Sequence, residues 1–257
     1  MSQLISKFTK PILSTACIFA LSGCLTINAK SLDFEETRNL TVPMGSANVL
    51  EVDAAAGFLK IVGDDTIQEV QVTADILAHD DDIKLRLEAK GDRIELEADA
   101  NHNSNYSWGR ESPRIDLTVR VPSGMKLKIK DGSGSINIKN INNDLSVDDG
   151  SGSMEISNIK GNLDIEDGSG SLTISVVDGN IVIDDGSGSL SVEQVTGTLD
   201  IDDGSGGLDV YDVGGLVTID DGSGGITVKK LKNGLTIIEE GSGGLKMTDI
   251  QGPVSIK

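Results

Sequence analysis

Aromatic residues, proline, histidine and cysteine are all scarce in this chain of 257 residues. Aromatic side chains make up only 3% of it, and it has 5 prolines, 2 histidines and 2 cysteines. Few aromatics make a large conventional core hard to fill, and few prolines argue against long proline-rich linkers. So few His and Cys residues provide no zinc cluster, and nothing in the sequence places His79 or His102 in a catalytic triad.

Basic residues are also a minority, with 22 Lys and Arg against 41 Asp and Glu, for a net charge of −19. Nucleic-acid backbones and anionic lipid surfaces both attract clustered positive charge, so neither is an expected partner for this chain. The acids are concentrated in residues 131–257, which hold 22 acids and 7 bases.

The first residues have the pattern of a bacterial export signal. Lys7 and Lys10 precede a short apolar run, which is too short to span a bilayer as a helix. Leu21-Ser22-Gly23-Cys24 then resembles the lipobox, in which the cysteine is lipidated and becomes the mature N-terminus. The alternative is an ordinary signal peptide cut elsewhere, for example after Ala29.

The resemblance to a lipobox implies a mature protein tied to a membrane through acyl chains on Cys24. Residues 1–23 are then the signal peptide, and residues 24–44 are an anchor and linker. Residue 25 is Leu rather than Asp, a pattern that implies the outer membrane if the cell is Gram-negative. The mature chain would contain no disulfide, because Cys17 leaves with the signal peptide.

The second half of the chain repeats with a fixed period. The tetrapeptide Asp-Gly-Ser-Gly recurs every 18 residues, starting at Asp131, Asp149, Asp167, Asp185, Asp203 and Asp221. A seventh copy begins one residue late, at Glu240, and Ile237-Ile238 is predicted to absorb the extra residue as a β-bulge.

Apolar residues recur two residues before the acid and five, seven and ten after it in all seven copies, and four residues before it in the first six. This alternation predicts two short strands per repeat. The Asp-Gly-Ser-Gly tetrapeptide makes one turn, and a column that is always Gly or Asn, twelve residues after the acid, marks the other as a left-handed position. The predicted fold is therefore an all-β parallel β-solenoid (β-helix) with 18-residue coils and two strands per coil, over residues 131–257.

Residues 45–130 alternate like strands but without a fixed length. Strand patterns occupy six segments: 50–53, 59–62, 69–77, 83–88, 93–98 and 115–121. We expect irregular first coils or an antiparallel cap here, because a bare parallel edge invites association with other chains.

Residues Val119 to Gly124 read Val-Arg-Val-Pro-Ser-Gly and are followed by an alternating strand and the repeated Asp-Gly-Ser-Gly-Ser turns. This combination resembles the bacterial putative-adhesin family of short β-strand repeats, over roughly residues 45–257. The resemblance implies a β-helical envelope protein and supplies no catalytic residues.

The acids at the turns are candidate cation ligands, because Ca²⁺ takes six to eight oxygens. The candidates are Asp149, Asp167, Asp185, Asp203 and Asp221. The competing interpretation, which we favour, is that each Asp accepts backbone N–H bonds within its own turn while the acid beside it is solvated. Charges about 4.8 Å apart repel by only about 0.9 kcal/mol in bulk water, which a packed solenoid tolerates. The sequence predicts no cofactor, with Ca²⁺ as the one alternative.

The segment 99–113 is a second candidate site. It contains Tyr106, Trp108 and Arg110, residue types that are frequent in contact surfaces. The alternative is that both aromatic side chains cover the apolar end of the rod.

The sequence therefore favours a non-enzymatic envelope lipoprotein that acts as an adhesin or as an interaction or structural protein. Its partners would be the membrane, through Cys24, and a cell-surface, polysaccharide or peptide ligand. One alternative is a Ca²⁺-stabilised rod or a sensor of cationic peptides that uses the acid columns. Another is a polysaccharide-active β-helix enzyme, which the short, regular coils disfavour.

Overall fold

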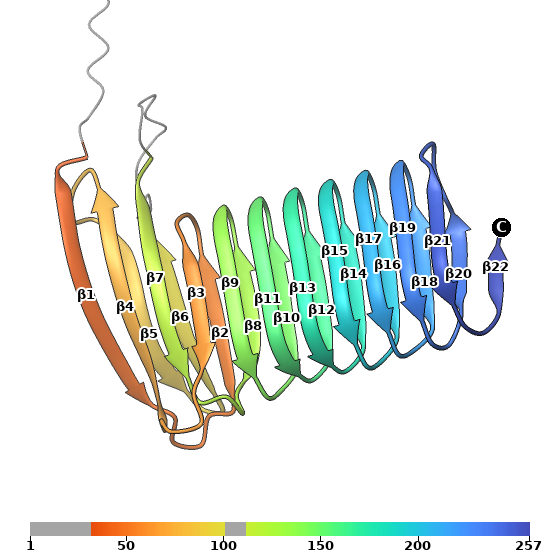
Figure 1. The fold of residues 1–257 in the computed structure, drawn as a ribbon. Helices are drawn as coiled ribbons and strands as arrows, with labels where there is room; N and C mark the ends of the chain where they lie inside the picture. Colours follow the sequence, from red (N-terminus) through yellow and green to blue (C-terminus); the bar gives the residue numbers. More distant parts are fainter. Residues whose placement is uncertain (1–31, 101–111) are drawn as a thin grey trace, which may run out of the picture.

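The computed structural model describes residues 32–100 and 112–257, which form two long sheets packed face to face along a rod (Figure 1). Each sheet has 11 strands. The described residues contain strands, turns and bends and no helix. The predicted all-β parallel solenoid is confirmed.

Each 18-residue repeat contributes one strand to each sheet. Sheet A takes the longer strands that follow the Asp-Gly-Ser-Gly turn: β9 (Gly134–Ile141), β11 (Gly152–Lys160), β13 (Gly170–Asp178), β15 (Gly188–Val195), β17 (Gly206–Val213), β19 (Gly224–Leu231) and β21 (Leu245–Ile250). Sheet B takes the shorter strands that precede it: β8 (Lys126–Asp131), β10 (Leu145–Asp149), β12 (Leu163–Asp167), β14 (Ile181–Asp185), β16 (Leu199–Asp203), β18 (Val217–Asp221), β20 (Leu235–Glu239) and β22 (Val254–Ile256).

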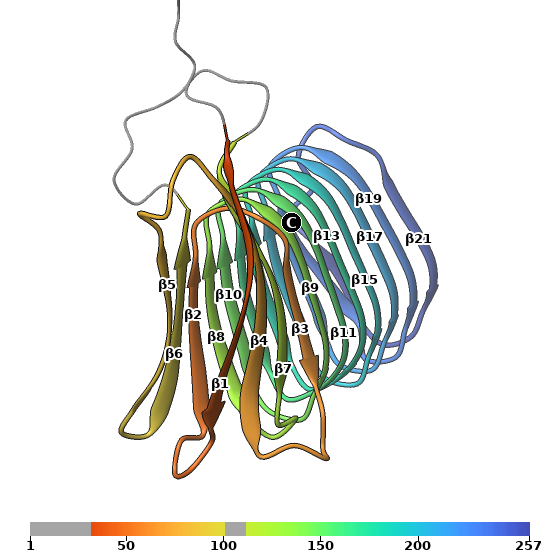
Figure 2. The ribbon, with the colours of Figure 1, turned by 90° about the vertical axis from the view of Figure 1, so that its left-hand side faces the viewer.

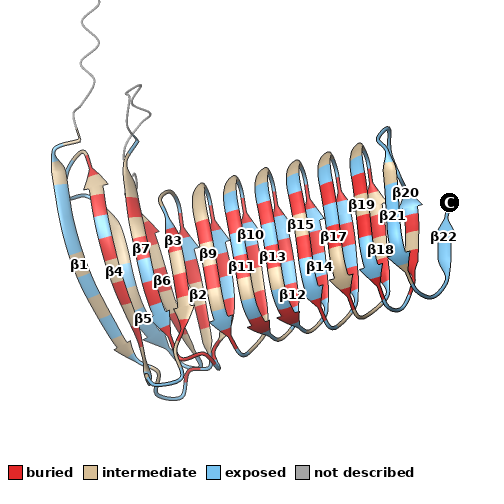
Figure 3. Ribbon diagram, in the orientation of Figure 1, coloured by how far each residue is buried: buried red, intermediate tan, exposed pale blue. Residues whose placement is uncertain are grey.

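Successive coils pair in parallel, residue on equivalent residue. Ile165, for example, lies opposite Val147 on one side and Ile183 on the other. Inward-facing apolar side chains form one continuous core along the rod. Along the strands, buried residues alternate with exposed or half-buried ones (Figure 3). Burial of each Val, Leu or Ile side chain contributes about 1.5–3 kcal/mol, so the stacked columns are the main source of stability.

The late seventh repeat is accommodated as predicted. Ile219 pairs with Ile237, but Asp220 pairs with Glu239, so the register shifts by one residue at Ile238.

The N-terminal region contains both coils and a cap. Its strands are β1 (Phe34–Pro43), β2 (Val49–Ala54), β3 (Leu59–Gly63), β4 (Glu69–Ala78), β5 (Lys84–Lys90), β6 (Arg93–Asp99) and β7 (Arg114–Val121). The pairs β2–β3 and β6–β7 form two parallel layers, whereas β1 and β4 in sheet A and β5 in sheet B add antiparallel strands. Figure 2 shows this end, with β1 and β5 outermost.

The layers do not follow chain order. In both sheets the β2–β3 layer lies between the β6–β7 layer and the first repeat, β8–β9. The segment of β4 to β7 is thus an excursion that closes the end of the rod, after which the chain returns to stack on β2 and β3.

Strand β1 corrects one expectation. We assigned residues 24–44 to an anchor and linker, but Phe34–Pro43 forms the outermost strand of sheet A. Its half-buried Phe34, Leu40 and Val42 pack against the core, whereas Glu35 and Glu36 face solvent. With five consecutive polar or charged residues between Phe34 and Leu40, such an edge strand gives a weak sequence signal.

Candidate functional site

A line of acids runs along the outer face of sheet B. Strands β10, β12, β14, β16 and β18 each end in two consecutive acids, and the first of the two faces outward, as strand alternation requires. Strand β20 ends in a single outward acid, Glu239. The strand register places these residues opposite one another in successive coils. We call this line the outer acid column: Asp148, Glu166, Asp184, Asp202, Asp220 and Glu239.

The outer acid column ends in a cation at the capped side of the rod. Lys130 pairs with Asp148 at 3.7 Å, and beyond it the face carries mixed charges, as in the Lys128–Glu51 pair. From coil to coil the carboxylates repeat at the strand spacing of about 4.8 Å, and Asp164 and Asp200 add further exposed acid on the same face. The face is therefore flat, regular and negative over six coils.

The second acid of each pair points the opposite way, into the rod, as does Asp131, which follows Lys130 in β8. These residues form the buried acid column, and each is only 1–3% exposed: Asp131, Asp149, Asp167, Asp185, Asp203 and Asp221. They lie at the edge of the core, where the chain turns from sheet B into sheet A. The acids beside the turn aspartates are thus exposed or half-buried, as the favoured interpretation expects, whereas the turn aspartates themselves are removed from water.

Part of the buried column caps the turns. The backbone N–H groups of Ser151, Ser169 and Ser187 donate to Oδ1 of the preceding Asp149, Asp167 and Asp185, at 3.2, 3.1 and 3.1 Å. The Oδ2 atoms of the same three aspartates are buried without a hydrogen-bond partner. The turns thus satisfy only half of each carboxyl group.

Burial raises the pKa of every member of the column. Desolvation is the largest cause, and for most members a neighbouring carboxylate adds to it. The pKa rises to about 7 for Asp131 and to about 6 for Asp167. Asp185 and Asp203 also have a pKa of about 6. The expected repulsion of about 0.9 kcal/mol applies to bulk water, whereas at an effective dielectric of about 20 it is about 3–4 kcal/mol. Ionising every carboxyl group of the column would therefore cost substantial free energy, and the raised pKa values favour keeping some of these groups protonated.

The same geometry bears on the Ca²⁺ hypothesis. Within residues 32–100 and 112–257, no group of three or more His, Cys, Asp or Glu side chains is placed to hold a metal ion. The buried aspartates lie in register along a single line, one coil apart, which gives any one point few of the six to eight oxygens that Ca²⁺ requires.

Glycine is required at the turn above the buried column. Gly170, the second glycine of its tetrapeptide, has φ +146°, and a Cβ there would lie 1.5 Å from the carbonyl oxygen of Gly152 in the coil below. The motif therefore reflects close stacking of turn on turn, and it leaves a shallow groove of Ser and Gly along this edge.

The other turn differs from the prediction. The Gly/Asn column is predicted to be left-handed, but of its members only Gly252 has a positive φ, +89°. In every coil a positive φ lies three residues earlier: Asn140, Asn158, Val176, Gln194, Asp212, Lys230 and Asp249. Each of these residues is skipped in the pairing of its sheet A strand with the neighbouring coil. The glycines serve close approach instead, because a Cβ on Gly179 would lie 2.0 Å from the carbonyl oxygen of Gly161.

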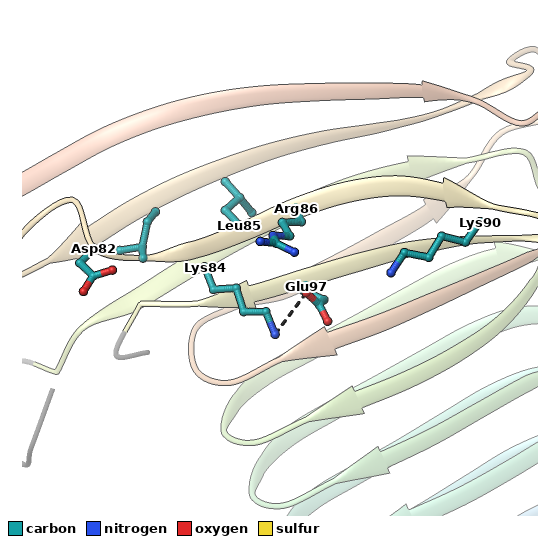
Figure 4. A pocket seen from close by; sticks show the side chains of 7 residues that line it. Asp82, Lys84, Leu85, Arg86, Lys90 and Glu97 are labelled. Carbon is teal, nitrogen blue, oxygen red and sulfur yellow. Dashed lines mark ion pairs between the residues drawn. The ribbon is translucent and has the colours of Figure 1, made fainter. Parts of the chain in front are cut away.

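An open groove of about 590 Å³ lies along β5 at the capped end (Figure 4). Lys84 in this groove pairs with Glu97 at 3.2 Å, and Lys90 pairs with Glu95 at 2.5 Å. Most of its charge is therefore already compensated within the cap.

The remaining predicted site residues are Cys24, Tyr106, Trp108 and Arg110. All four lie outside the described residues, so their roles stay predictions. Within the described ranges, no helix is long and apolar enough to span a membrane.

No protein-family model and no curated protein sequence matches the chain. Among solved structures, it is similar to a putative cell adhesion protein from Clostridium sporogenes, with 14% identity, a TM-score of 0.35 and coverage of 87% of this chain and 98% of that one. It is also similar to a putative adhesin from Bacteroides fragilis, with 14% identity, a TM-score of 0.34 and coverage of 86% and 96%. A putative adhesin from Parabacteroides merdae shows 10% identity, a TM-score of 0.41 and the same coverage. At these identities and TM-scores, no function carries over to this chain.

Proposed function

We propose that this protein is an adhesin-like binding rod of the bacterial cell envelope, without enzymatic activity of its own. It is held to the membrane through lipidated Cys24, at the outer membrane if the cell is Gram-negative. Its binding face is the outer surface of sheet B. The observation that carries the proposal is the outer acid column, with six carboxylates held in register on a flat sheet.

The physical argument concerns charge and rigidity. An exposed surface of one sign raises the local concentration of oppositely charged partners and steers their approach. Because the parallel ladder fixes the carboxylates, little conformational entropy is lost when an extended cationic chain lies along them. A cationic peptide or a basic cell-surface protein is therefore the favoured class of partner.

The test compares two triple variants with the same change in charge. Glu166→Gln/Asp184→Asn/Asp202→Asn neutralises part of the outer acid column. Glu155→Gln/Glu193→Gln/Asp209→Asn neutralises three acids on the exposed face of sheet A. Binding to immobilised poly-L-lysine is measured at two salt concentrations, because screening weakens exposed charge interactions.

We expect the sheet B variant to weaken binding roughly tenfold and the sheet A variant to weaken it less than about twofold. Equal weakening by both variants would mean that only net charge matters, and the binding face would then be wrong. Membrane attachment is tested separately, by mass spectrometry of the N-terminal peptide and by the loss of membrane association in Cys24→Ala.

A further inference from the structure

An exposed aromatic ring interrupts a column of small residues on sheet A. The position four residues after the turn acid is Ser or Gly in all seven repeats. In β3, Leu59 pairs with Ile136, so the residue before it, Phe58, takes the place of Ser135. Phe58 is 39% exposed and lies outside the core cluster, whereas the other aromatic side chains that the structure describes are half-buried. The ring therefore does not serve to fill the core.

The backbone of Phe58 is held from two directions. Its N–H group donates to Oδ1 of Asp116 at 2.8 Å, and its carbonyl oxygen accepts from the N–H group of Leu117 at 2.6 Å. The preceding Gly57 has φ +127°, and a Cβ there would lie 2.3 Å from the carbonyl oxygen of Ile115. The chain thus packs closely against β7 at this point. A ring on so well fixed a backbone loses little conformational entropy when a ligand lies against it.

Phe58 lines one side of a hollow of about 350 Å³ on the outer face of β9, β11 and β13, the next three strands of sheet A (Figure 1). Small-ligand sites usually have volumes of about 300–1,000 Å³, so the hollow is at the lower end of that range. Two rows of polar side chains line it, each from one position of the repeat: Ser135, Ser153 and Ser171, and Asn137, Glu155 and Thr173. An aromatic wall and a polar surface thus meet in one place.

The polar side chains are held in place and keep hydrogen-bonding capacity. Ser153 Oγ donates to Ser135 Oγ at 3.0 Å, and Asn137 Nδ2 donates to Oε2 of Glu155 at 2.9 Å. A hydroxyl group has one donor and two acceptor sites, and a carboxylate accepts several hydrogen bonds, so these contacts leave further sites for a ligand. The strand register places the members of each row one coil apart, about 4.8 Å. Donors and acceptors therefore recur at a regular spacing.

The charge of the hollow restricts the class of ligand. Among the described residues that line it, none is Lys, Arg or His, and Glu155 is the single charged side chain. On the capped side, Asp116 is paired with Arg114 at 3.3 Å. An acidic ligand therefore meets no cation in the lining, and one carboxylate gives a polycation little to bind. A neutral ligand with many hydroxyl groups and one apolar face fits this surface.

We propose that this hollow binds a neutral saccharide chain. The apolar C–H face of one sugar ring lies against the Phe58 ring, and its hydroxyl groups, which both donate and accept, bond to the two polar rows. The saccharide runs across the strands, so that further rings reach Ser171 and Thr173. The site is on sheet A, whereas the binding face proposed above is on sheet B, so neither depends on the other.

The test measures electrophoretic mobility in native gels that contain a dissolved polysaccharide. The protein is residues 24–257 carrying Cys24→Ser, which retain every described residue. The neutral polymers are hydroxyethylcellulose, galactomannan and dextran, and polygalacturonate is the acidic one. An open site binds a single sugar weakly, and a polymer compensates by offering many sites. We expect at least one neutral polymer to slow the protein relative to a polymer-free gel, and polygalacturonate not to slow it.

Variants at Phe58 separate ring stacking from general apolar contact. Phe58→Tyr keeps the ring and should be slowed like the unaltered chain. Phe58→Leu keeps an apolar side chain, and Phe58→Ser introduces the residue type that the next coil has at Ser135. Both should raise the apparent Kd roughly fivefold or more. The control Val182→Ser removes an apolar side chain that is 51% exposed on sheet B, and it should leave the apparent Kd unchanged.

Thermal melts verify that each variant folds. If none of the three neutral polymers slows the protein, or if Phe58→Leu is slowed as much as the unaltered chain, the proposal is wrong. Slowing by polygalacturonate alone would indicate an anion-binding surface and would also overturn it. The outer acid column variant Glu166→Gln/Asp184→Asn/Asp202→Asn should still be slowed. Loss of slowing in that variant would place the saccharide on sheet B and refute the assignment to Phe58.

Discussion

Asp185→Asn gives the sharpest test of the buried acid column. Asp185 is 1% exposed, and its register neighbours in the adjacent coils are Asp167 and Asp203. Desolvation and, next, the charge of Asp167 raise its pKa from 3.8 to about 6, despite the hydrogen bond from Ser187. Asparagine keeps the Oδ1 acceptor, removes the charge and offers an N–H donor to a neighbouring carboxylate.

The direction in which stability changes with pH follows from the linkage between proton binding and folding. A carboxyl whose pKa is raised by folding contributes stability that is complete below its unfolded pKa, and that stability is lost as pH rises through about 6. A rise of about two pKa units corresponds to about 3 kcal/mol, an upper estimate because the column titrates as a coupled set. Asp185→Asn should therefore stabilise the rod by up to about 3 kcal/mol at pH 8, roughly 6–12 °C in Tm, and by little at pH 4.

The assay is a thermal melt followed by circular dichroism at pH 4, 6 and 8. The control is Asp184→Asn, the same change one residue earlier in the exposed outer acid column, which should move Tm by only about 1 °C at any pH. If Asp185→Asn lowers Tm at pH 8, the ionised carboxyl stabilises the fold. If the effect on Tm does not change between pH 4 and pH 8, folding does not raise the pKa of Asp185. Either result refutes the reasoning.

Three further outcomes are expected. Changing from EDTA to millimolar Ca²⁺ should move Tm by less than about 2 °C, because few carboxylate oxygens converge at any point of the buried column; a large upward shift would establish a metal site. Gly170→Ala should cost about 3 kcal/mol or more, or prevent folding, because its Cβ would collide with the Gly152 carbonyl; a Tm near that of the unaltered chain would contradict the turn stacking. Val176→Asn should raise Tm by a few degrees, because a β-branched residue is strained at φ +56° and asparagine is not; an unchanged or lower Tm would argue against that strain.

The sequence was sufficient for the solenoid, because a fixed period allows each column to be read in several copies. Ile165, Ile183 and Ile201 occupy one position, and parallel stacking is the arrangement that brings them together. The irregularity in the seventh repeat could also be predicted, because one extra residue in a paired strand is most simply accommodated as a β-bulge.

Other features depended on information that a one-dimensional pattern does not hold. The alternation Leu163, Ile165, Asp167 places the aspartate on the inner face, but it gives no measure of how completely the next coil covers the carboxyl group. Because glycine tolerates left-handed backbone best, the sequence predicts a left-handed residue at Gly179. In the structure Val176 has the left-handed conformation instead, because the stacking of coil on coil fixes the position of the turn and overrides residue preference. The closed end was expected in general terms, but the sequence held no signal for the order of its layers.

That order has a consequence for how the chain acquires its structure. Strands β2 and β3 pair with β8 and β9 at a sequence separation of 77 residues, whereas the later coils pair at 18. Closing the longer loop costs about 1.3 kcal/mol more, and afterwards each coil closes a short one. In a chain that emerges N-terminus first, we expect folding to wait until residue 141 is available and then to proceed coil by coil. The region up to β9 is thus the slow nucleus of folding, and lengthening the rod by further repeats would add little to its folding time.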